Sequence, residues 1–178
     1  MTGRVAVVAG RLIDHPQTPP RLRRFPPERA DAVKTALRRA FMRYRIRTLI
    51  ASAACGADLL ALDVAGELGI RRRIVLPRAV RAFEKSSVRR CGGDWPAVYQ
   101  AVVEAVRDAG DLIVLPRARS PYRAANLRLL DEARAEAGRR RPLAIVVWDG
   151  PRGAEDMTAH FRDEAERRGL DIVTIRTM

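Results

Sequence analysis

The sequence is poor in several residue types, and each shortage excludes a class of protein. Among its 178 residues are only two histidines and two cysteines, and aromatic residues make up 5%. His15 and His160 have no metal-ligand spacing, so neither a metal nor a cofactor is expected. Cys55 and Cys91 are far apart in the sequence and form no redox motif, which predicts free thiols in a cytoplasmic protein. The few aromatic residues supply no stacking platform for single-stranded nucleic acid.

Long apolar runs and the common nucleotide and hydrolase motifs are also missing. No apolar run approaches the roughly 18 residues that a membrane-spanning helix needs, and residues 1–4 lead into a strand instead of a signal peptide. We therefore expect a cytoplasmic protein without membrane contact. The chain contains no G-x-G-x-x-G, no G-x-x-x-x-G-K-[ST] and no G-x-S-x-G sequence. These absences argue against a dinucleotide dehydrogenase, a P-loop nucleotidase and an α/β-hydrolase.

Positive charge is in surplus, with a formal net charge of +13. A surplus of this size often indicates a polyanionic partner such as nucleic acid. Of the 34 basic residues, however, only Lys34 and Lys85 are lysines, a bias that is also typical of a high-GC genome. Arginine runs at residues 71–73 and 139–141 fall at predicted helix-to-strand junctions, where cations complement helix C-termini. The charge alone leaves both interpretations open.

What the sequence does contain is a regular alternation of apolar strands and amphipathic helices. Strands are predicted at residues 4–9, 48–51, 73–77, 111–116, 143–148 and 171–175. Helices are predicted at residues 28–44, 57–68 and 95–109, within 121–140, and at 154–168. A long proline-rich loop is expected at residues 11–27, and an irregular stretch at residues 78–94.

This alternation predicts an α/β fold with a mainly parallel sheet of about six strands. Continuous apolar strands are typical of a sheet that helices cover on both faces. Right-handed crossovers then produce a single Rossmann-like, doubly wound, three-layer sandwich. The sequence has no internal repeat and no linker, so residues 1–178 are expected to form one domain.

The most informative stretch is residues 50–58, Ile-Ala-Ser-Ala-Ala-Cys-Gly-Ala-Asp, which joins a strand to a helix. Small residues at such a junction let a ligand approach the backbone, and the helix N-terminus behind them attracts anions. Alternatively, the stretch is a tight turn whose small residues only allow the helix to pack on the sheet. The spacing does not decide between the two readings.

In a parallel α/β sheet the ligand lies beyond the C-terminal ends of the strands, where the strand order reverses. Loops after several strands here carry suitable groups: the Ser52 hydroxyl, N–H groups near Gly56, and guanidinium groups that could pair with phosphate. Each residue alone has a simpler explanation. Asp58 could bond to its own helix turn, and Asp149 could belong to a turn. The hypothesis of a site depends on their convergence.

Several segments resemble one branch of the SLOG superfamily. These segments are residues 10–14, Gly-Arg-Leu-Ile-Asp; residues 24–26, Arg-Phe-Pro; residues 52–58, Ser-Ala-Ala-Cys-Gly-Ala-Asp; and residues 147–150, Val-Trp-Asp-Gly. SLOG domains are Rossmann-like and are related to the LOG phosphoribohydrolases and to the DNA-processing protein DprA. The branch occurs in bacteria, often attached to nucleotide-cyclase or tetratricopeptide-repeat signalling proteins. The likeness extends over nearly the whole chain.

The resemblance implies that a nucleotide-derived ligand binds to the loops named above. The sequence also departs from the LOG enzymes, which carry the motif Pro-Gly-Gly-x-Gly-Thr-x-x-Glu after the fourth strand. Here residues 115–122 read Leu-Pro-Arg-Ala-Arg-Ser-Pro-Tyr, which argues against phosphoribohydrolase activity. In a second departure, Gly10 is followed by Arg11 at a position where histidine is common in this branch. The expected ligand-binding residues are Gly10, Arg11, Asp14, Ser52, Ala53, Cys55, Gly56, Asp58, Pro77, Arg78, Tyr122, Asn126, Asp149, Gly150, Gly153 and Thr158.

Three hypotheses follow for function. The first is a sensor that binds a nucleotide or an NAD- or ADP-ribose-like metabolite and acts through a separate partner or a homo-oligomer. The second is a nucleotide N-glycosidase, which needs a carboxylate near the anomeric carbon; the candidates are Asp14, Asp58, Asp149 and Glu155. The third is a DprA-like nucleic-acid-binding protein that uses the arginine surplus and therefore loses affinity steeply with salt.

Overall fold

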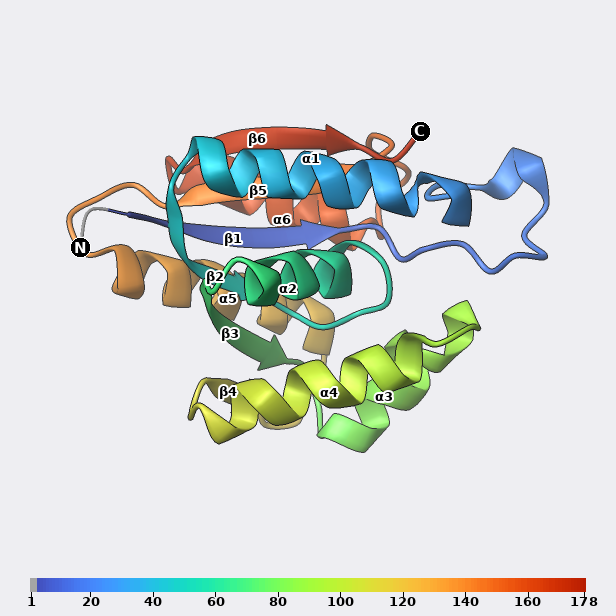
Figure 1. The fold of residues 1–178 in the computed structure, drawn as a ribbon, viewed down its shortest axis with the longest axis horizontal. Helices are drawn as coiled ribbons and strands as arrows, with labels where there is room; N and C mark the ends of the chain where they lie inside the picture. Colours follow the sequence, from blue (N-terminus) through green and yellow to red (C-terminus); the bar gives the residue numbers. More distant parts are fainter. Residues whose placement is uncertain (1–2) are drawn as a thin grey trace.

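The computed structural model describes residues 3–178, which form one six-stranded parallel sheet in the order β4-β3-β2-β1-β5-β6. Figure 1 shows the sheet between two layers of helices. The strands are β1 (Arg4–Gly10), β2 (Ile46–Ala51), β3 (Arg71–Leu76), β4 (Leu112–Val114), β5 (Leu143–Trp148) and β6 (Asp171–Arg176). All five strand pairings are parallel. The predicted α/β sandwich is confirmed.

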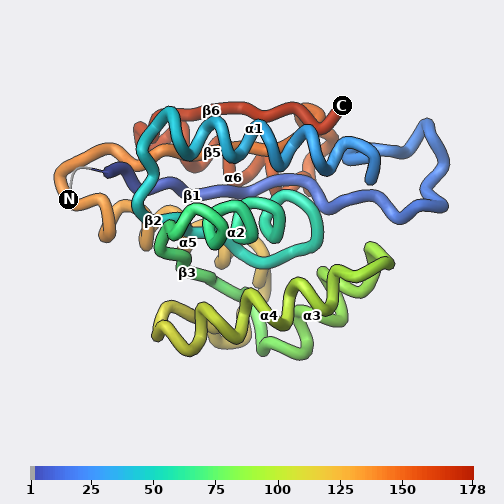
Figure 2. Tube along the Cα trace, in the orientation of Figure 1, coloured from blue at the N-terminus to red at the C-terminus, as the bar shows by residue number. Residues whose placement is uncertain are grey.

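The two helix layers are built by alternate residues of the same strands. Ala6 and Val8 of β1 face α1 (Ala30–Arg43), α2 (Ala57–Glu67) and α4 (Trp95–Asp108). Val5 and Val7 face the opposite layer, formed by α5 (Pro121–Ala137) and α6 (Met157–Arg167). Both layers bury their share of β1, which is why the strand is apolar without alternation. The tube in Figure 2 shows α1 and α2 running across one face of the sheet.

The strand order reverses at β1. From β1 the chain steps outward through β2 and β3 to β4, then α5 carries it back across the sheet to β5 on the other side of β1. The loops that leave β1 and β5 therefore turn toward opposite layers. This divergence opens a crevice at the C-terminal ends of the two strands, where ligands bind in folds of this kind.

One helix lies where the sequence predicts an irregular stretch. Residues 78–94 contain α3 (Val80–Ser87) and the short 3₁₀ turn η3 (Arg89–Cys91). Helix α3 has only eight residues, too few for a repeating apolar pattern, and its buried side chains include Glu84 and Ser87 beside Phe83. Together with α4 it forms a lobe beside the β3–β4 edge of the sheet (Figure 1).

Other element boundaries differ from the prediction for local reasons. Strand β4 has three residues, because it pairs with β3 only over Leu112–Val114. Strands β2 and β3 begin two residues earlier than predicted, because their first positions include arginines that break the apolar pattern. Helix α6 begins at Met157, since the Asp156 side chain caps it by accepting from the N–H groups of Thr158 and Ala159, both at 3.0 Å.

The loop at residues 11–27 is folded against the rest of the molecule. The Asp14 carboxylate accepts hydrogen bonds from the backbone N–H groups of Arg24 and Phe25 at 2.8 and 2.9 Å. Phe25 is fully buried, and the Thr177 hydroxyl donates to the Arg24 carbonyl. Because both ends of the loop are held, it forms a fixed wall beside the crevice.

The two cysteines, which the sequence predicts to be free, are joined in the structure by a disulfide. Cys55, after β2, and Cys91, in η3, are 36 residues apart in sequence, but their Cα atoms are 6.5 Å apart. The prediction of free thiols is therefore wrong for this structure. The reason is tertiary, because the α3–α4 lobe folds back over the β2–α2 loop, a contact that sequence spacing does not reveal.

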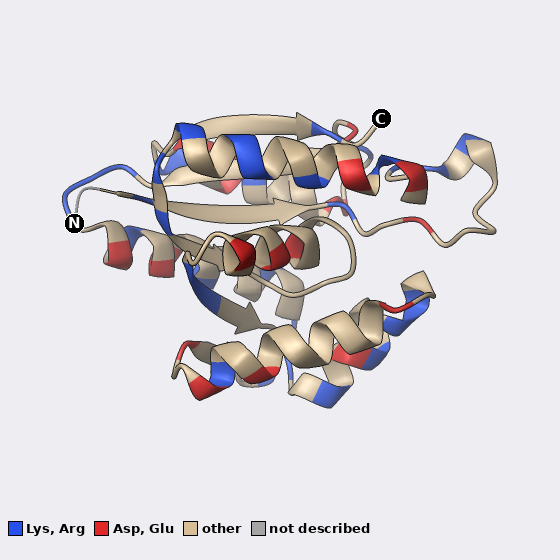
Figure 3. Cartoon of the chain, in the orientation of Figure 1, with Lys and Arg blue, Asp and Glu red and all other residues tan. Residues whose placement is uncertain are grey.

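The arginine run of β3 is largely matched by carboxylates. Arg71 binds Asp111 at 2.8 Å, and Arg73 binds Asp111 at 3.0 Å and Glu132 at 2.9 Å. Arg72 donates to the Leu62 carbonyl in α2 at 3.4 Å. In Figure 3 this run colours the start of β3, and acidic positions lie along the neighbouring helices. Much of the basic charge of β3 thus serves the fold.

None of the described helices, within residues 3–178, is long and apolar enough to cross a membrane.

Candidate ligand-binding site

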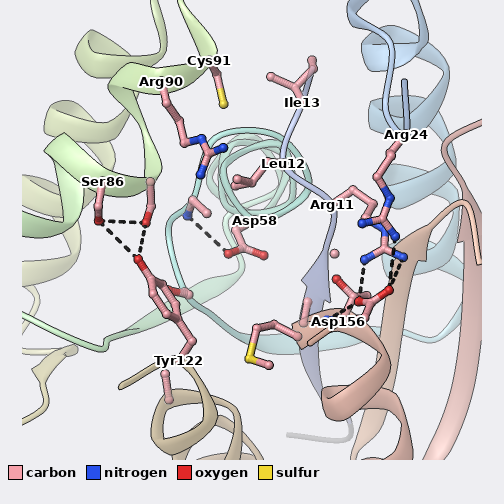
Figure 4. A pocket seen from close by; sticks show the side chains of 18 of the residues that line it. Arg11, Leu12, Ile13, Arg24, Asp58, Ser86, Arg90, Cys91, Tyr122 and Asp156 are labelled. Atoms are coloured by element: carbon pink, nitrogen blue, oxygen red, sulfur yellow. Dashed lines mark hydrogen bonds and ion pairs between the residues drawn. The ribbon is translucent and has the colours of Figure 1, made fainter. Parts of the chain in front are cut away.

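A cavity of about 620 Å³ lies at the C-terminal ends of the strands, where the reversal of strand order predicts a ligand. Its walls come from the segments after β1 and β2, from α3 and η3, and from the first turns of α5 and α6. Figure 4 shows it from close by. The volume is within the range of small-molecule sites.

Half of the sixteen expected ligand-binding residues line this cavity. They are Gly10, Arg11, Asp14, Ser52, Asp58, Tyr122, Asn126 and Thr158. Eight others lie outside its lining: Ala53, Cys55, Gly56, Pro77, Arg78, Asp149, Gly150 and Gly153. The eight lining residues come from four separate parts of the chain.

Gly10 and Gly56 are explained by close packing of the chain on itself. A Cβ at Gly56, whose φ is +105°, would lie 2.5 Å from the backbone nitrogen of Ile13. A Cβ at Gly10 would lie 2.5 Å from the Ala57 Cβ. The β2–α2 loop is bonded to the segment after β1, because Ala57 donates to the Arg11 carbonyl and Ile13 donates to the Cys55 carbonyl. The close packing at both glycines agrees with the explanation that small residues here allow the helix to pack on the sheet.

On one side of the cavity is a network of ion pairs, which we call the ion-pair wall: Arg11, Arg24 and Asp156, which line the cavity, and Asp149, which lies behind the lining. Arg11 is 6% exposed and binds Asp149 through Nε at 2.8 Å. It also binds both oxygens of Asp156, at 2.6 and 2.7 Å, and the Gly150 carbonyl. Arg24 adds a bond to Asp156 at 3.2 Å. Each of the three guanidinium nitrogens of Arg11 therefore donates to a protein acceptor.

The acids of the ion-pair wall are held in their ionised form. Burial by itself would raise the pKa of Asp156, but hydrogen bonds from Arg11 and from backbone N–H groups outweigh burial and hold this pKa well below its ordinary value. Burial and Arg11 act on Asp149 in the same opposing ways, and the pKa of Asp149 is lowered as well. The wall joins the ends of β1 and β5 to the start of α6.

The opposite side of the cavity carries what we call the hydroxyl–arginine cluster: Ser86, Ser87, Tyr122 and Arg90, which line the cavity, and Arg78, which lies outside the lining. The Tyr122 hydroxyl lies 3.0 Å from Ser87 Oγ and 3.3 Å from Ser86 Oγ, and the two serine oxygens are 3.1 Å apart. The Arg78 guanidinium lies over the Tyr122 ring, 5.2 Å from its centre. Figure 4 shows Arg90 above Ser86 and Tyr122, on the far side of the cavity from Arg11.

The charges of this cluster act on the phenol of Tyr122. Burial would raise its pKa, but hydrogen bonds with Ser86 and Ser87 and the positive charges of Arg78 and Arg90 together lower it. The phenol thus experiences a net positive field. Arg11 is bound to the carboxylates of Asp149 and Asp156, whereas Arg78 and Arg90 have no carboxylate partner among the described residues.

Asp58 lies between the two walls. Its side chain projects toward the middle of the cavity (Figure 4), and the residue is 7% exposed. One carboxylate oxygen accepts from the backbone N–H of Ala54 at 3.3 Å. Burial raises the pKa of Asp58 to about 7, against the weaker opposing effect of that hydrogen bond. Asp58 is therefore a buried acid whose charge changes near neutral pH.

Asn126 and Thr158 connect helices at the floor of the cavity. The Asn126 amide donates to the Met157 carbonyl at 2.9 Å and lies 3.1 Å from His160 Nδ1, which links α5 to α6. The Thr158 N–H is taken by the Asp156 cap. These contacts position the α6 turn beside the ion-pair wall.

Sequence reasoning missed several lining residues. Ser86, Ser87 and Arg90 belong to α3 and η3, which the sequence predicts as an irregular stretch. Asp156 and Arg24 also line the cavity. A usable signal existed for Asp156, because an aspartate directly before a helix is a common N-cap. Within the described residues, no group of three or more His, Cys, Asp or Glu side chains could hold a metal ion.

No protein-family model matches the chain. A search of curated proteins also finds no match. Among solved structures, the chain is similar to the X-ray structure of DNA processing protein A (DprA) from Streptococcus pneumoniae, with a TM-score of 0.39 and 15% sequence identity. The match covers 97% of this chain and 59% of that one, so the chain spans about three fifths of the length of that protein.

Proposed function

We propose that the cavity binds a nucleotide or a nucleotide-derived small molecule, of the NAD or ADP-ribose kind, and that the protein acts as a sensor of this ligand. One observation carries the proposal: a single cavity at the strand ends places the carboxyl group of Asp58 opposite a cluster of hydroxyl and guanidinium donors. A nucleotide has hydroxyl donors at its ribose and acceptor oxygens at its phosphate, so its two ends match these two groups.

The rest of the lining supports the same class of ligand. Phe83, Ala125, Leu129 and Met157 contribute apolar surface between the polar groups, against which a base can pack. Asp58 is the residue proposed to accept from ribose hydroxyls, and Ser52 supplies a further hydroxyl beside it. A sensor must also pass the signal on, for which we propose a partner or a change in self-association that responds to the bound ligand.

A thermal-shift panel tests the proposal, using nucleoside mono-, di- and triphosphates, cyclic nucleotides, NAD, ADP-ribose and a short oligonucleotide. A ligand at about 100 times its dissociation constant adds roughly 2.7 kcal/mol to the free energy of unfolding. We expect a shift from one nucleotide family. A shift from the oligonucleotide alone, lost steeply with added salt, would instead favour the nucleic-acid hypothesis.

The residue assignment is tested with a matched pair of variants on α2. We expect Asp58→Asn to weaken the responding nucleotide about tenfold, because a charge-assisted hydrogen bond to ribose becomes a neutral one. Asp63→Asn is the control, since Asp63 is on the same helix but is 42% exposed and binds Lys34. Equal affinities for the two variants would place the ribose elsewhere.

A second candidate function is hydrolysis of an N-glycosidic bond. The observation that favours it is Asp58 itself, a buried acid in the cavity whose pKa of about 7 suits proton exchange at neutral pH. Incubation with each nucleotide, followed by chromatography for the free base, tests this candidate. Base release that disappears in Asp58→Asn would make the protein an enzyme; intact nucleotide would leave binding as its function.

A further inference from the structure

The hydroxyl–arginine cluster differs from the ion-pair wall in what it lacks, because the wall's arginines are bound to Asp149 and Asp156. Arg89, directly before Arg90, binds Glu84 at 2.8 Å. For Arg78 and Arg90, by contrast, no carboxylate oxygen among residues 3–178 is within the 4.0 Å that defines an ion pair. Two guanidinium groups thus face the same phenol without an acid between them.

The three hydroxyl groups of the cluster lie within hydrogen-bond distance of one another, and either oxygen of each pair can be the donor. Ser86 and Ser87 are the last residues of α3, and Tyr122 is in the first turn of α5, so two separate helices bring the oxygens to within 3.0–3.3 Å of each other. Ser87 is 4% exposed, which fixes its position. Hydroxyl protons rotate to suit a partner, and a phosphate oxygen can accept from more than one of them.

Three other places beside the cavity that could take an anion already have protein partners. The loop before α2 bonds to the segment after β1, through Ala57 to the Arg11 carbonyl. The N-terminus of α6 is capped by the Asp156 carboxylate, and Arg11 is bound to Asp149 and Asp156. Of the three arginines that line the cavity, Arg11 and Arg24 are paired with carboxylates, and Arg90 has no carboxylate partner among the described residues.

We propose that Ser86, Ser87 and Tyr122, with Arg78 and Arg90, form a subsite for the phosphate group of a phosphate monoester. The orientation rests on the proposed function: the phosphate lies on this cluster and the ribose points toward Asp58. A monoester suits the subsite because it carries close to two negative charges at neutral pH, which two guanidinium groups can match. The ligand class is therefore a ribose phosphate or nucleoside monophosphate with a terminal phosphate.

Titration with inorganic phosphate, followed by ³¹P NMR, tests the subsite without any assumption about the rest of the ligand. We expect saturable binding to the wild-type protein. Arg90→Gln and Tyr122→Phe should each weaken it about tenfold or more, because each removes hydrogen bonds to a charged oxygen. Arg139→Gln is the charge-matched control at the opposite end of α5 and should leave phosphate affinity within about twofold.

Two results would overturn the subsite: no saturable phosphate binding by the wild-type protein, or unchanged binding by both Arg90→Gln and Tyr122→Phe. Urea midpoints equal to wild type show that the variants are folded.

A second comparison, adenosine against adenosine monophosphate, separates this subsite from the proposed function. We expect the monophosphate to bind at least about tenfold more tightly than the nucleoside, and Arg90→Gln to abolish this difference. Equal binding of the two would overturn the subsite and leave the proposed function standing. Phosphate binding that depends on Arg90, with no gain from any nucleoside attached to it, would overturn the proposed function and leave the subsite standing.

Discussion

The two walls of the cavity use arginine in opposite ways. In the ion-pair wall, the side chains of Arg11, Asp149 and Asp156 are 6%, 1% and 0% exposed, so each charge has exchanged water for a partner. In the hydroxyl–arginine cluster, Arg90 is exposed and faces hydroxyl groups. Four of the five N–H donors of the Arg11 guanidinium are used within the protein, and its charge is matched by two buried carboxylates. The ion-pair wall therefore holds the fold together, while the cluster remains available for binding.

The contrast predicts its largest effect for Arg11→Met. Removing the guanidinium leaves Asp149 and Asp156 buried without their main partner, a change that typically costs about 3–5 kcal/mol. Urea unfolding followed by circular dichroism measures the free energy of unfolding. Arg162→Gln, in an exposed pair with Glu166, is the control and should change it by less than about 1 kcal/mol. A loss for Arg11→Met as small as that of the control would contradict the role of the ion-pair wall.

The next effect concerns Asp58, between the walls. Its pKa is about 7 in the folded protein and about 4 in an unfolded chain. Between these values the unfolded chain releases the proton that the folded protein keeps, so rising pH lowers the free energy of unfolding. Asp58→Asn should match wild type near pH 4 and exceed its stability by up to about 4 kcal/mol at pH 8. A constant difference from pH 4 to pH 8 would show that Asp58 titrates normally.

The disulfide joins the two sides of the comparison, because Cys55 adjoins the β2–α2 loop and Cys91 belongs to the same turn as Arg90. Closing a loop of this length typically stabilises a protein by about 2–4 kcal/mol. Reductant should therefore lower the urea midpoint of the wild-type protein and leave that of Cys55→Ala unchanged. A cytoplasmic setting keeps thiols reduced, so a thiol count on protein purified without reductant decides which state occurs. Two reactive thiols in the native protein would contradict the disulfide.

The smallest effect on stability is expected for Arg90→Gln. Arg90 is exposed and has no carboxylate partner among the described residues, so its loss should change the free energy of unfolding by less than about 0.5 kcal/mol. This near-zero result sharpens the comparison with Arg11→Met, since the same residue type is removed from the same cavity. A stability loss above about 2 kcal/mol would mean that Arg90 is a structural residue.

Strong local patterns made much of the fold predictable. The strand at residues 143–148 was predicted at the observed position, because six consecutive buried residues leave an unbroken apolar run. Helix α3 was not predicted, since it is only eight residues long and its buried face includes a glutamate and a serine beside Phe83. Because α3 and the following turn were not predicted, Ser86, Ser87 and Arg90 were missing from the predicted site. These are three of the five residues of the hydroxyl–arginine cluster.

The predicted site residues illustrate the same limit. Ser52 and Asp58 line the cavity as expected from their place after a strand. Arg11 was expected to be available to phosphate, but whether an arginine is free depends on carboxylates more than 130 residues away, as the Asp149 and Asp156 bonds show. A residue type and its position in a loop do not reveal its partners.

The sequence by itself determined the parallel sandwich and the edge at which a ligand is expected, because apolar periodicity and strand–helix alternation are local and repeated along the chain. The tertiary structure alone decided which arginines are paired, which cysteines meet and which hydroxyl groups converge. Those outcomes depend on distances between segments that are 35 to 145 residues apart, from Tyr122 with Ser87 to Arg11 with Asp156. Only the packing of the complete fold sets such distances.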